Sequence, residues 1–219
     1  MTGSELASII DHTLLKPQAV AGDIEKLCEE TIQYGFASAC INPVWVPLAS
    51  ELLRGSSPVV CMIIAAPLIL QCSHIEEAAK AVNSGAGELD MVIPVGYLKG
   101  GLVKETAAFV RDVVNAAEGR PVKVILETCL LTDEEKVLAC RISMDSGASW
   151  VKTSTGFSTG GATVEDVALM KRTVGDELGV KASGGIRTLS DALAMIEAGA
   201  GRLGCSRSVE IVQGIRPDI

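Results

Sequence analysis

The chain has 219 residues, a formal net charge of −8 and 48% hydrophobic residues. This length leaves room for one large domain or two small ones, and the apolar fraction is high enough for a sizeable core. The acidic balance argues against non-specific binding to nucleic acid. The seven cysteines are scattered, without a Cys-x-x-Cys pair. That pattern favours reduced thiols over a disulfide framework or a zinc site.

The first residues, Met1 to Glu5, have neither a basic flank nor a long apolar region, so no signal peptide is predicted. No apolar run in the sequence approaches the length that spans a bilayer. We therefore expect a soluble cytoplasmic protein without a membrane partner. Because the sequence has no linker, low-complexity segment or shift in composition, residues 1–219 are expected to form a single domain.

Short β-rich runs alternate with longer amphipathic runs along the chain. The expected strands are Ser8–Leu14, Phe36–Ile41, Val59–Ala65, Glu88–Ile93, Val122–Glu127, Trp150–Thr153, Val180–Ser183 and Arg202–Cys205. The expected helices are Gly22–Tyr34, Ser73–Ser84, Val103–Ala117, Thr132–Ser146, Thr163–Glu177 and Leu189–Ala198. Thr132 and Glu135 fit a capping box at the start of one helix. Gly85, Gly147 and Gly199 suit helix C-termini.

Strand-then-helix alternation predicts a parallel sheet with crossover helices. Eight such units in this length fit a (β/α)₈ barrel, near the small end of its usual size. The alternative is an open doubly wound sheet. Against it, no G-x-G-x-x-G motif follows the first expected strand. The predicted fold class is therefore α/β, a single-domain (β/α)₈ TIM barrel.

Lys152 and Lys181 each lie inside an apolar expected strand. Charged side chains are rarely buried unless they are paired. A buried amine beside a second cation loses its proton readily, and a neutral amine attacks a carbonyl to form a Schiff base. Lys152 is the Schiff-base candidate and Lys181 the neighbouring cation. The alternative is that both are structural, with Lys152 paired to Glu127 or Asp90 and Lys181 to a carboxylate.

Asp90 lies in the otherwise apolar strand Glu88–Ile93. Both faces of a parallel sheet are covered, so an acidic residue there needs a reason. One role is proton transfer, directly or through a water. The alternative is a buried counter-ion for one of the lysines, and both roles can hold together.

Glycine-rich segments follow the last two expected strands, at Ala182–Arg187 and Gly204–Ser208. Free backbone N–H groups at helix starts suit a phosphate, and barrels often bind phosphate after strands seven and eight. Together these segments predict a phosphate site.

The two histidines, His12 and His74, have no metal-ligand company at useful spacing, so no metal site is predicted. No Ser-His-Asp or Cys-His arrangement is recognised in the sequence. Cys40 ends the second expected strand and is a candidate for the pocket wall. The alternative reading of Cys40 is a small buried hydrophobe.

Five segments together resemble the deoxyribose-phosphate aldolase family, and the resemblance covers nearly the whole chain. The segments are Ile10–Pro17, Glu88–Ile93, Leu126–Thr128, Trp150–Phe157 and Val180–Arg187. The two lysine motifs with their flanks are highly specific together. The resemblance implies a (β/α)₈ barrel and a class I aldolase. Such an enzyme reversibly cleaves 2-deoxy-D-ribose 5-phosphate into acetaldehyde and D-glyceraldehyde 3-phosphate, without a metal or other cofactor.

The resemblance also implies roles for particular residues. Lys152 would be the Schiff-base lysine, with Asp90 and Lys181 as the proton relay. Phosphate contacts are implied for Gly156, Gly184, Gly185 and Ser206, and sugar contacts for Thr13, Cys40 and Thr155. The implied partner is a small phosphorylated sugar. Because the family is often dimeric, a homodimer is one expectation for its assembly.

The chain departs from the family's pattern in two loops. The family has Phe-Pro-Leu-Gly after the third strand, whereas this chain has a different stretch at Ala65–Leu70. Its paired serines after the last strand are here Ser206 and Arg207, and the arginine either binds phosphate or points to solvent. Two alternatives stay open: a class I aldolase for another aldehyde or keto acid, and a phosphate-binding barrel without catalysis.

Overall fold

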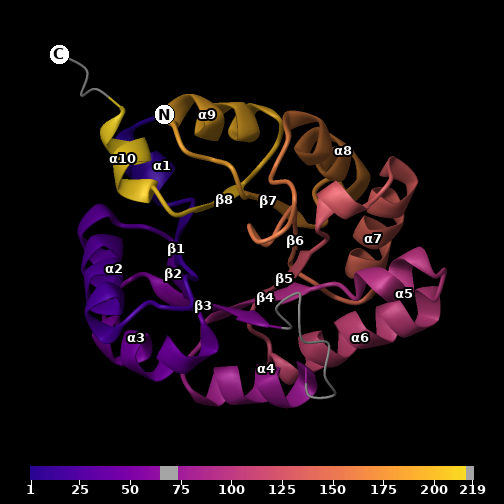
Figure 1. Ribbon diagram of the computed structural model, residues 1–219, viewed down its shortest axis with the longest axis horizontal. Helices are drawn as coiled ribbons and strands as arrows, with labels where there is room; N and C mark the ends of the chain where they lie inside the picture. Colours follow the sequence, from indigo (N-terminus) through magenta and orange to yellow (C-terminus); the bar gives the residue numbers. More distant parts are fainter. Residues whose placement is uncertain (65–73, 216–219) are drawn as a thin grey trace.

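The computed structural model describes residues 1–64 and 74–215. Eight parallel strands pair in chain order, and β1 also pairs with β8, so the sheet closes into a barrel ringed by helices (Figure 1). The strands are β1 (Ile10–Leu14), β2 (Ser38–Ile41), β3 (Val59–Ile64), β4 (Glu88–Val92), β5 (Val122–Ile125), β6 (Trp150–Lys152), β7 (Gly179–Ser183) and β8 (Arg202–Cys205). The predicted (β/α)₈ barrel is confirmed, and closure of the sheet excludes the open alternative.

Helices fill the crossovers between the strands, while one helix precedes β1 and another follows β8. They are α1 (Gly3–Ala7), α2 (Ala21–Tyr34), α3 (Val46–Leu52), α4 (His74–Asn83), α5 (Val95–Lys99), α6 (Val103–Ala116), α7 (Asp133–Asp145), α8 (Val164–Val174), α9 (Leu189–Glu197) and α10 (Ser208–Gln213), with 3₁₀ turns η1 (Pro43–Trp45) and η2 (Thr128–Leu130). The sequence missed α1, α3, α5 and α10. Each has seven residues or fewer, too short to display a helical period. Across the described ranges, no helix combines the length and apolar character needed to cross a membrane.

The helix ends follow the local signals in the sequence. The side chain of Thr132 accepts from the N–H of Glu135, and the Glu135 carboxylate accepts from the N–H of Thr132 at 2.8 Å, which confirms the capping box. Gly85, Gly147 and Gly199 have φ angles of 100°, 83° and 111°. A side chain rarely tolerates such angles, so glycine lets the chain turn from a helix into the next strand.

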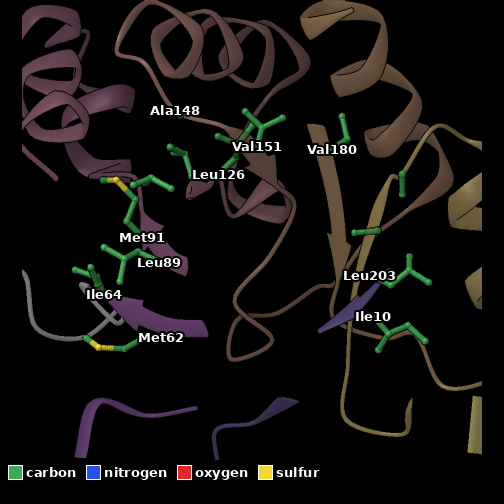
Figure 2. Close-up of a cluster of buried hydrophobic side chains, with 14 of the residues drawn as sticks. Ile10, Met62, Ile64, Leu89, Met91, Leu126, Ala148, Val151, Val180 and Leu203 are labelled. Atoms are coloured by element: carbon green, nitrogen blue, oxygen red, sulfur yellow. The ribbon is translucent and has the colours of Figure 1, made fainter. Parts of the chain in front are cut away.

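Alternate strand residues face outward and pack beneath the helices. Figure 2 shows part of this layer, including Ile10, Met62, Leu89, Val151 and Leu203, all of which belong to the main apolar core. Each of these five residues is at most 2% exposed. Because removal of apolar surface from water is the main favourable term in folding, this layer fixes the strands against the helices.

The remaining strand residues face the barrel interior, where many of them are charged. Asp90 on β4 is the register partner of Lys123 on β5, and Lys152 on β6 is the partner of Lys181 on β7. A small apolar cluster that includes Ile63 shares the interior. Inward-facing side chains fill a barrel of this size, so the strand register forces these charged groups together.

Candidate active site

A cavity of about 320 Å³ opens at the C-terminal ends of β1, β6, β7 and β8. In (β/α)₈ enzymes this face carries the chemistry. The predicted site residues that line the cavity are Thr13, Lys152, Thr155, Gly156, Gly184, Gly185 and Ser206. The other predicted residues, Cys40, Asp90 and Lys181, are fully buried and lie outside this lining. Segments that are far apart in the sequence therefore converge on one end of the barrel.

One carboxylate joins the two predicted catalytic lysines. The Nζ atoms of Lys152 and Lys181 each lie 2.7 Å from Oδ2 of Asp90. The side chains of Asp90 and Lys181 are fully buried, whereas that of Lys152 is 4% exposed and lines the cavity. A ligand in the cavity therefore meets the amine of Lys152, with Asp90 and Lys181 behind it.

Lys123 occupies the other oxygen of the same carboxylate. Its Nζ lies 2.9 Å from Oδ1 of Asp90 and 2.6 Å from Oε2 of Glu88. The thiol of Cys61 also donates to Oδ1 of Asp90, at 3.1 Å. A charge-assisted hydrogen bond is stronger than a neutral one, so these contacts fix the orientation of Asp90 within the barrel.

Asp11 on β1 fixes the position of Lys181 in a similar way. It contacts the ammonium group of Lys181 directly. Its Oδ1 accepts from Nη1 of Arg202 at 2.8 Å and from the hydroxyl of Ser38 at 2.7 Å. Removing one partner of a buried ion pair typically costs 3–5 kcal/mol, roughly, because the other charge is left unpaired. Asp11 therefore anchors Lys181 against Asp90.

The electrostatics of this network hold Asp90 ionised. Burial would raise the pKa of Asp90, but the ammonium groups of Lys123, Lys152 and Lys181 outweigh burial and hold that pKa well below its usual range. Burial would lower the pKa of Lys181, but the carboxylates of Asp11 and Asp90 raise it above its usual value. At neutral pH Asp90 is a carboxylate and Lys181 an ammonium group.

Lys181 is a neighbour of Lys152, as expected, and the two lysines share one carboxylate. The two lysines are register partners, but Oδ2 of Asp90 contacts both Nζ atoms. A carboxylate shared by two ammonium groups offsets their repulsion. Of the two carboxylates considered as partners of Lys152, the structure pairs it with Asp90.

The charges of the network do not cancel. It contains the carboxylates of Asp11, Glu88 and Asp90 and the cationic groups of Lys123, Lys152, Lys181 and Arg202. Three negative and four positive groups leave one positive charge in excess. Of the three lysines, Lys152 alone lines the cavity.

Glu127 supports the cavity wall and does not pair with Lys152. Its carboxylate accepts from the hydroxyl of Thr155 at 2.5 Å and from the N–H of Thr155 at 3.3 Å. Its backbone is left-handed, with φ 56°, a conformation that costs a non-glycine residue of the order of 1–3 kcal/mol. The strained turn directs Glu127 at Thr155 and so fixes a predicted sugar contact.

Two groups of side chains bring potential metal ligands within 4.8 Å of one another. They are Cys40, Cys61 and Asp90, and Asp11, Cys61 and Glu88. The carboxylates of both groups already accept from buried lysine ammonium groups. A metal cation would have to displace a buried cation of the same sign, so this donor set does not fit a resident metal. Cys40 itself is fully buried among these groups.

Sequence reasoning missed Lys123 and assigned no role to Asp11. The sequence does contain a signal for Lys123, because it is a charged residue between Val122 and Val124 in an apolar strand. Asp90 was found from the same kind of signal. The pairing itself was not available, since Lys123 and Asp90 are 33 residues apart. Of the departures from the family's pattern, Ala65–Leu70 lies outside the described residues.

Comparisons with known proteins identify related aldolases. The model of the DeoC/LacD family aldolases matches residues 6–214. Two curated relatives are named deoxyribose-phosphate aldolase. The relative from Carboxydothermus hydrogenoformans is 53% identical over 98% of this chain and 97% of its own length. The relative from Streptococcus sanguinis is 57% identical over 96% of both.

Solved structures extend the likeness to three dimensions. The tetrameric deoxyribose phosphate aldolase from Aeropyrum pernix matches with a TM-score of 0.90 and 35% identity, over 97% of this chain and 91% of that one. The fold of this chain is thus shared with a solved aldolase structure. This chain belongs to the DeoC/LacD family of aldolases, which confirms the resemblance recognised in the sequence.

Proposed function

We propose that this chain is a class I aldolase that reversibly cleaves 2-deoxy-D-ribose 5-phosphate to acetaldehyde and D-glyceraldehyde 3-phosphate, in deoxyribose phosphate catabolism. The observation that carries the proposal is the Nζ of Lys152 at the cavity wall, 2.7 Å from Oδ2 of Asp90. The name shared by the curated relatives supports the choice of substrate. The reaction needs no metal or other cofactor, because a protein amine supplies the electron sink.

The reaction begins when the neutral amine of Lys152 attacks the C1 aldehyde of the open-chain sugar. Loss of water from the adduct gives an iminium ion, whose nitrogen draws the electrons of the C2–C3 bond. The carboxylate of Asp90, beside Nζ, then stabilises the iminium charge.

The C2–C3 bond breaks as the C3 hydroxyl loses its proton. Asp90 accepts this proton, directly or through a water, with Lys181 bound to the same oxygen 2.7 Å away. Because the pKa of Asp90 is held well below its usual range, the carboxylate relays the proton and does not retain it. D-glyceraldehyde 3-phosphate departs, the enamine on Lys152 takes a proton at C2, and hydrolysis releases acetaldehyde.

We assign the phosphate to the glycine turns of the cavity wall. Gly156, Gly184 and Gly185 line the cavity with φ angles of 88°, 84° and 83°, and such turns direct backbone N–H groups at anions. Lys16 and Arg187 also line the cavity, and no carboxylate belongs to the described part of its wall. Arg207 does not line it, which favours Arg187 over Arg207 as the arginine for the phosphate.

The decisive experiment is borohydride trapping with acetaldehyde, followed by peptide mass spectrometry. A reduced ethyl adduct on Lys152 is expected. An adduct on Lys181 would exchange the roles of the two lysines. Absence of an adduct with any aldehyde would favour the alternative of a phosphate-binding barrel without catalysis. Relative rates on phosphorylated and unphosphorylated aldehydes would test the remaining alternative, an aldolase for another aldehyde or keto acid.

The proposal includes cytoplasmic localisation and self-association, with a homodimer as the expected assembly. The Aeropyrum pernix relative is described as a tetramer, which supports association between copies but not a particular number. Light scattering coupled to size-exclusion chromatography would determine the number of subunits.

A further inference from the structure

His12 is hydrogen-bonded through both ring nitrogens outside the barrel. Its Nδ1 lies 2.9 Å from the hydroxyl oxygen of Ser208, and its Nε2 lies 2.9 Å from Oε2 of Glu30. His12 is 4% exposed and Ser208 is fully buried. The sequence did not reveal this Ser-His-Glu chain, because its members come from α10, β1 and α2. The aldol chemistry uses none of the three residues.

The arrangement does not serve a nucleophilic serine. The hydroxyl of Ser208 is fully buried, and it donates to the carbonyl oxygen of Cys205 at 3.0 Å. Ser208 lines neither the cavity described above nor the adjoining hollow of about 350 Å³ that His12 and Glu30 help to line. A nucleophile must reach a bound substrate, so this chain of hydrogen bonds has a different use.

The role of this chain of hydrogen bonds follows from the peptide unit that contains the carbonyl of Cys205. The peptide unit between Cys205 and Ser206 is planar, so the hydrogen bond that fixes the oxygen of Cys205 also fixes the direction of the N–H of Ser206. Ser206 and the preceding Gly204 both line the cavity. The orientation of the turn between β8 and α10 therefore depends on the hydroxyl of Ser208.

We propose that Ser208 and His12 are positioning residues that hold the turn between β8 and α10, and with it Ser206, in the arrangement that binds the substrate's phosphate. Glu30 on α2 holds the ring of His12, His12 holds the hydroxyl of Ser208, and Ser208 holds the carbonyl of Cys205. This inference rests on the proposed function, and on the phosphate contact that the family resemblance implies for Ser206, which lines the cavity.

The central test is Ser208→Ala, which removes the bridging hydroxyl and little volume. Loss of one positioning hydrogen bond is expected to raise KM for 2-deoxyribose 5-phosphate about fivefold to tenfold. KM for unphosphorylated 2-deoxyribose is expected to change less than about twofold, because that sugar lacks the group that Ser206 binds. The affinity for inorganic phosphate, measured by calorimetry, is expected to weaken in parallel with the first KM.

Ser143→Ala is the matched control. Ser143 is also fully buried and its hydroxyl donates to a carbonyl, that of Ala139 at 2.7 Å on α7. Ser143→Ala should leave both KM values and phosphate binding unchanged, although it also removes one buried serine hydroxyl. If Ser208→Ala does not fold, His12→Gln decides, since a glutamine amide cannot bridge both partners of the ring. The same selective rise in KM is expected.

The outcomes separate this inference from the function beneath it. An active wild-type enzyme with unchanged phosphate binding in folded Ser208→Ala overturns the positioning role alone. An equal rise in KM for both sugars would mean that the hydrogen bond stabilises the fold in general, and this would also overturn the positioning role. A wild-type chain that neither cleaves 2-deoxyribose 5-phosphate nor binds phosphate removes the proposed function and this inference together.

Discussion

Asp90 receives lysine ammonium groups on both of its oxygens, from Lys123 on one side and from Lys152 and Lys181 on the other. The same contacts give it two tasks. They make Asp90 the counter-ion that lets three lysines be buried, and they leave it ionised next to the amine that lines the cavity. The two sequence interpretations of Asp90, proton transfer and buried counter-ion, are therefore compatible in this geometry.

Asp90→Asn is expected to lower kcat by about a hundredfold to ten-thousandfold, because the amide cannot accept the C3 proton. It is also expected to lower stability, since three ammonium groups would face a neutral side chain. Steady-state rates should be measured where circular dichroism shows both proteins folded. A folded variant with an unchanged rate would reduce Asp90 to a structural counter-ion.

Lys152→Ala is expected to abolish turnover while leaving the fold intact, because no other lysine of the network lines the described cavity. Lys136→Ala is the matched control. Lys136 pairs with Asp166 at 2.6 Å between α7 and α8, so its loss should leave kcat near the wild-type value. Activity close to wild type in Lys152→Ala would contradict the Schiff-base mechanism.

At the scale of elements, the strands bring charged groups together only because their register is fixed. Gly204 on β8 shows that the strand register leaves almost no space between neighbouring strands. A Cβ atom there would lie 2.9 Å from Cβ of Ser183 and 3.2 Å from Cε of Lys181. Both distances are shorter than ordinary contacts, so an added methyl group would displace its neighbours on β7.

Gly204→Ala is therefore expected to lower kcat at least about tenfold by moving Lys181, and to cost about 1–3 kcal/mol of stability. Gly22→Ala on α2 is the control, since a Cβ there meets nothing within 4 Å. It should retain full activity. Rates and urea unfolding of both variants check the prediction, and full activity in Gly204→Ala would show that the strand can yield.

The same scale shows which elements a sequence predicts well. Strands such as β8 (Arg202–Cys205) matched the expected residues in full, because apolar runs between turn signals are local features. Others were expected too long, as at Ser8–Leu14, where β1 begins at Ile10. The preceding α1, with five residues, packs against α10, and that tertiary contact leaves no mark in the local pattern.

At the scale of the whole molecule, the buried network links stability to acid. Burial would raise the pKa values of Asp11 and Asp90, but neighbouring cations, Lys181 among them, hold both below 3.8. The unfolded chain therefore binds protons more readily than the folded chain as the pH falls through about 4. The stabilisation is fully present above this pH and is lost below it.

We expect the free energy of unfolding to fall as the pH is lowered from about 5 to 3. Urea denaturation at fixed pH values would measure it, and Asp11→Asn should show a shallower decline because one of the two groups is gone. A flat profile over this range would mean that the network does not stabilise the fold through these carboxylates.

The sequence by itself determined the alternation of strands and helices and the family, and it singled out the two lysines and one aspartate that the structure brings together at the cavity. Those are local signals: a period, a motif, a charge in an apolar run. That residues 1–219 form a single domain stays a prediction. Only the tertiary structure decided which carboxylate meets which amine, since Asp90 is 62 residues from Lys152 and 91 from Lys181. It also decided that His12 joins Glu30 to Ser208. Such pairings depend on closure of the barrel, which brings distant strands into one register and buries their charges together.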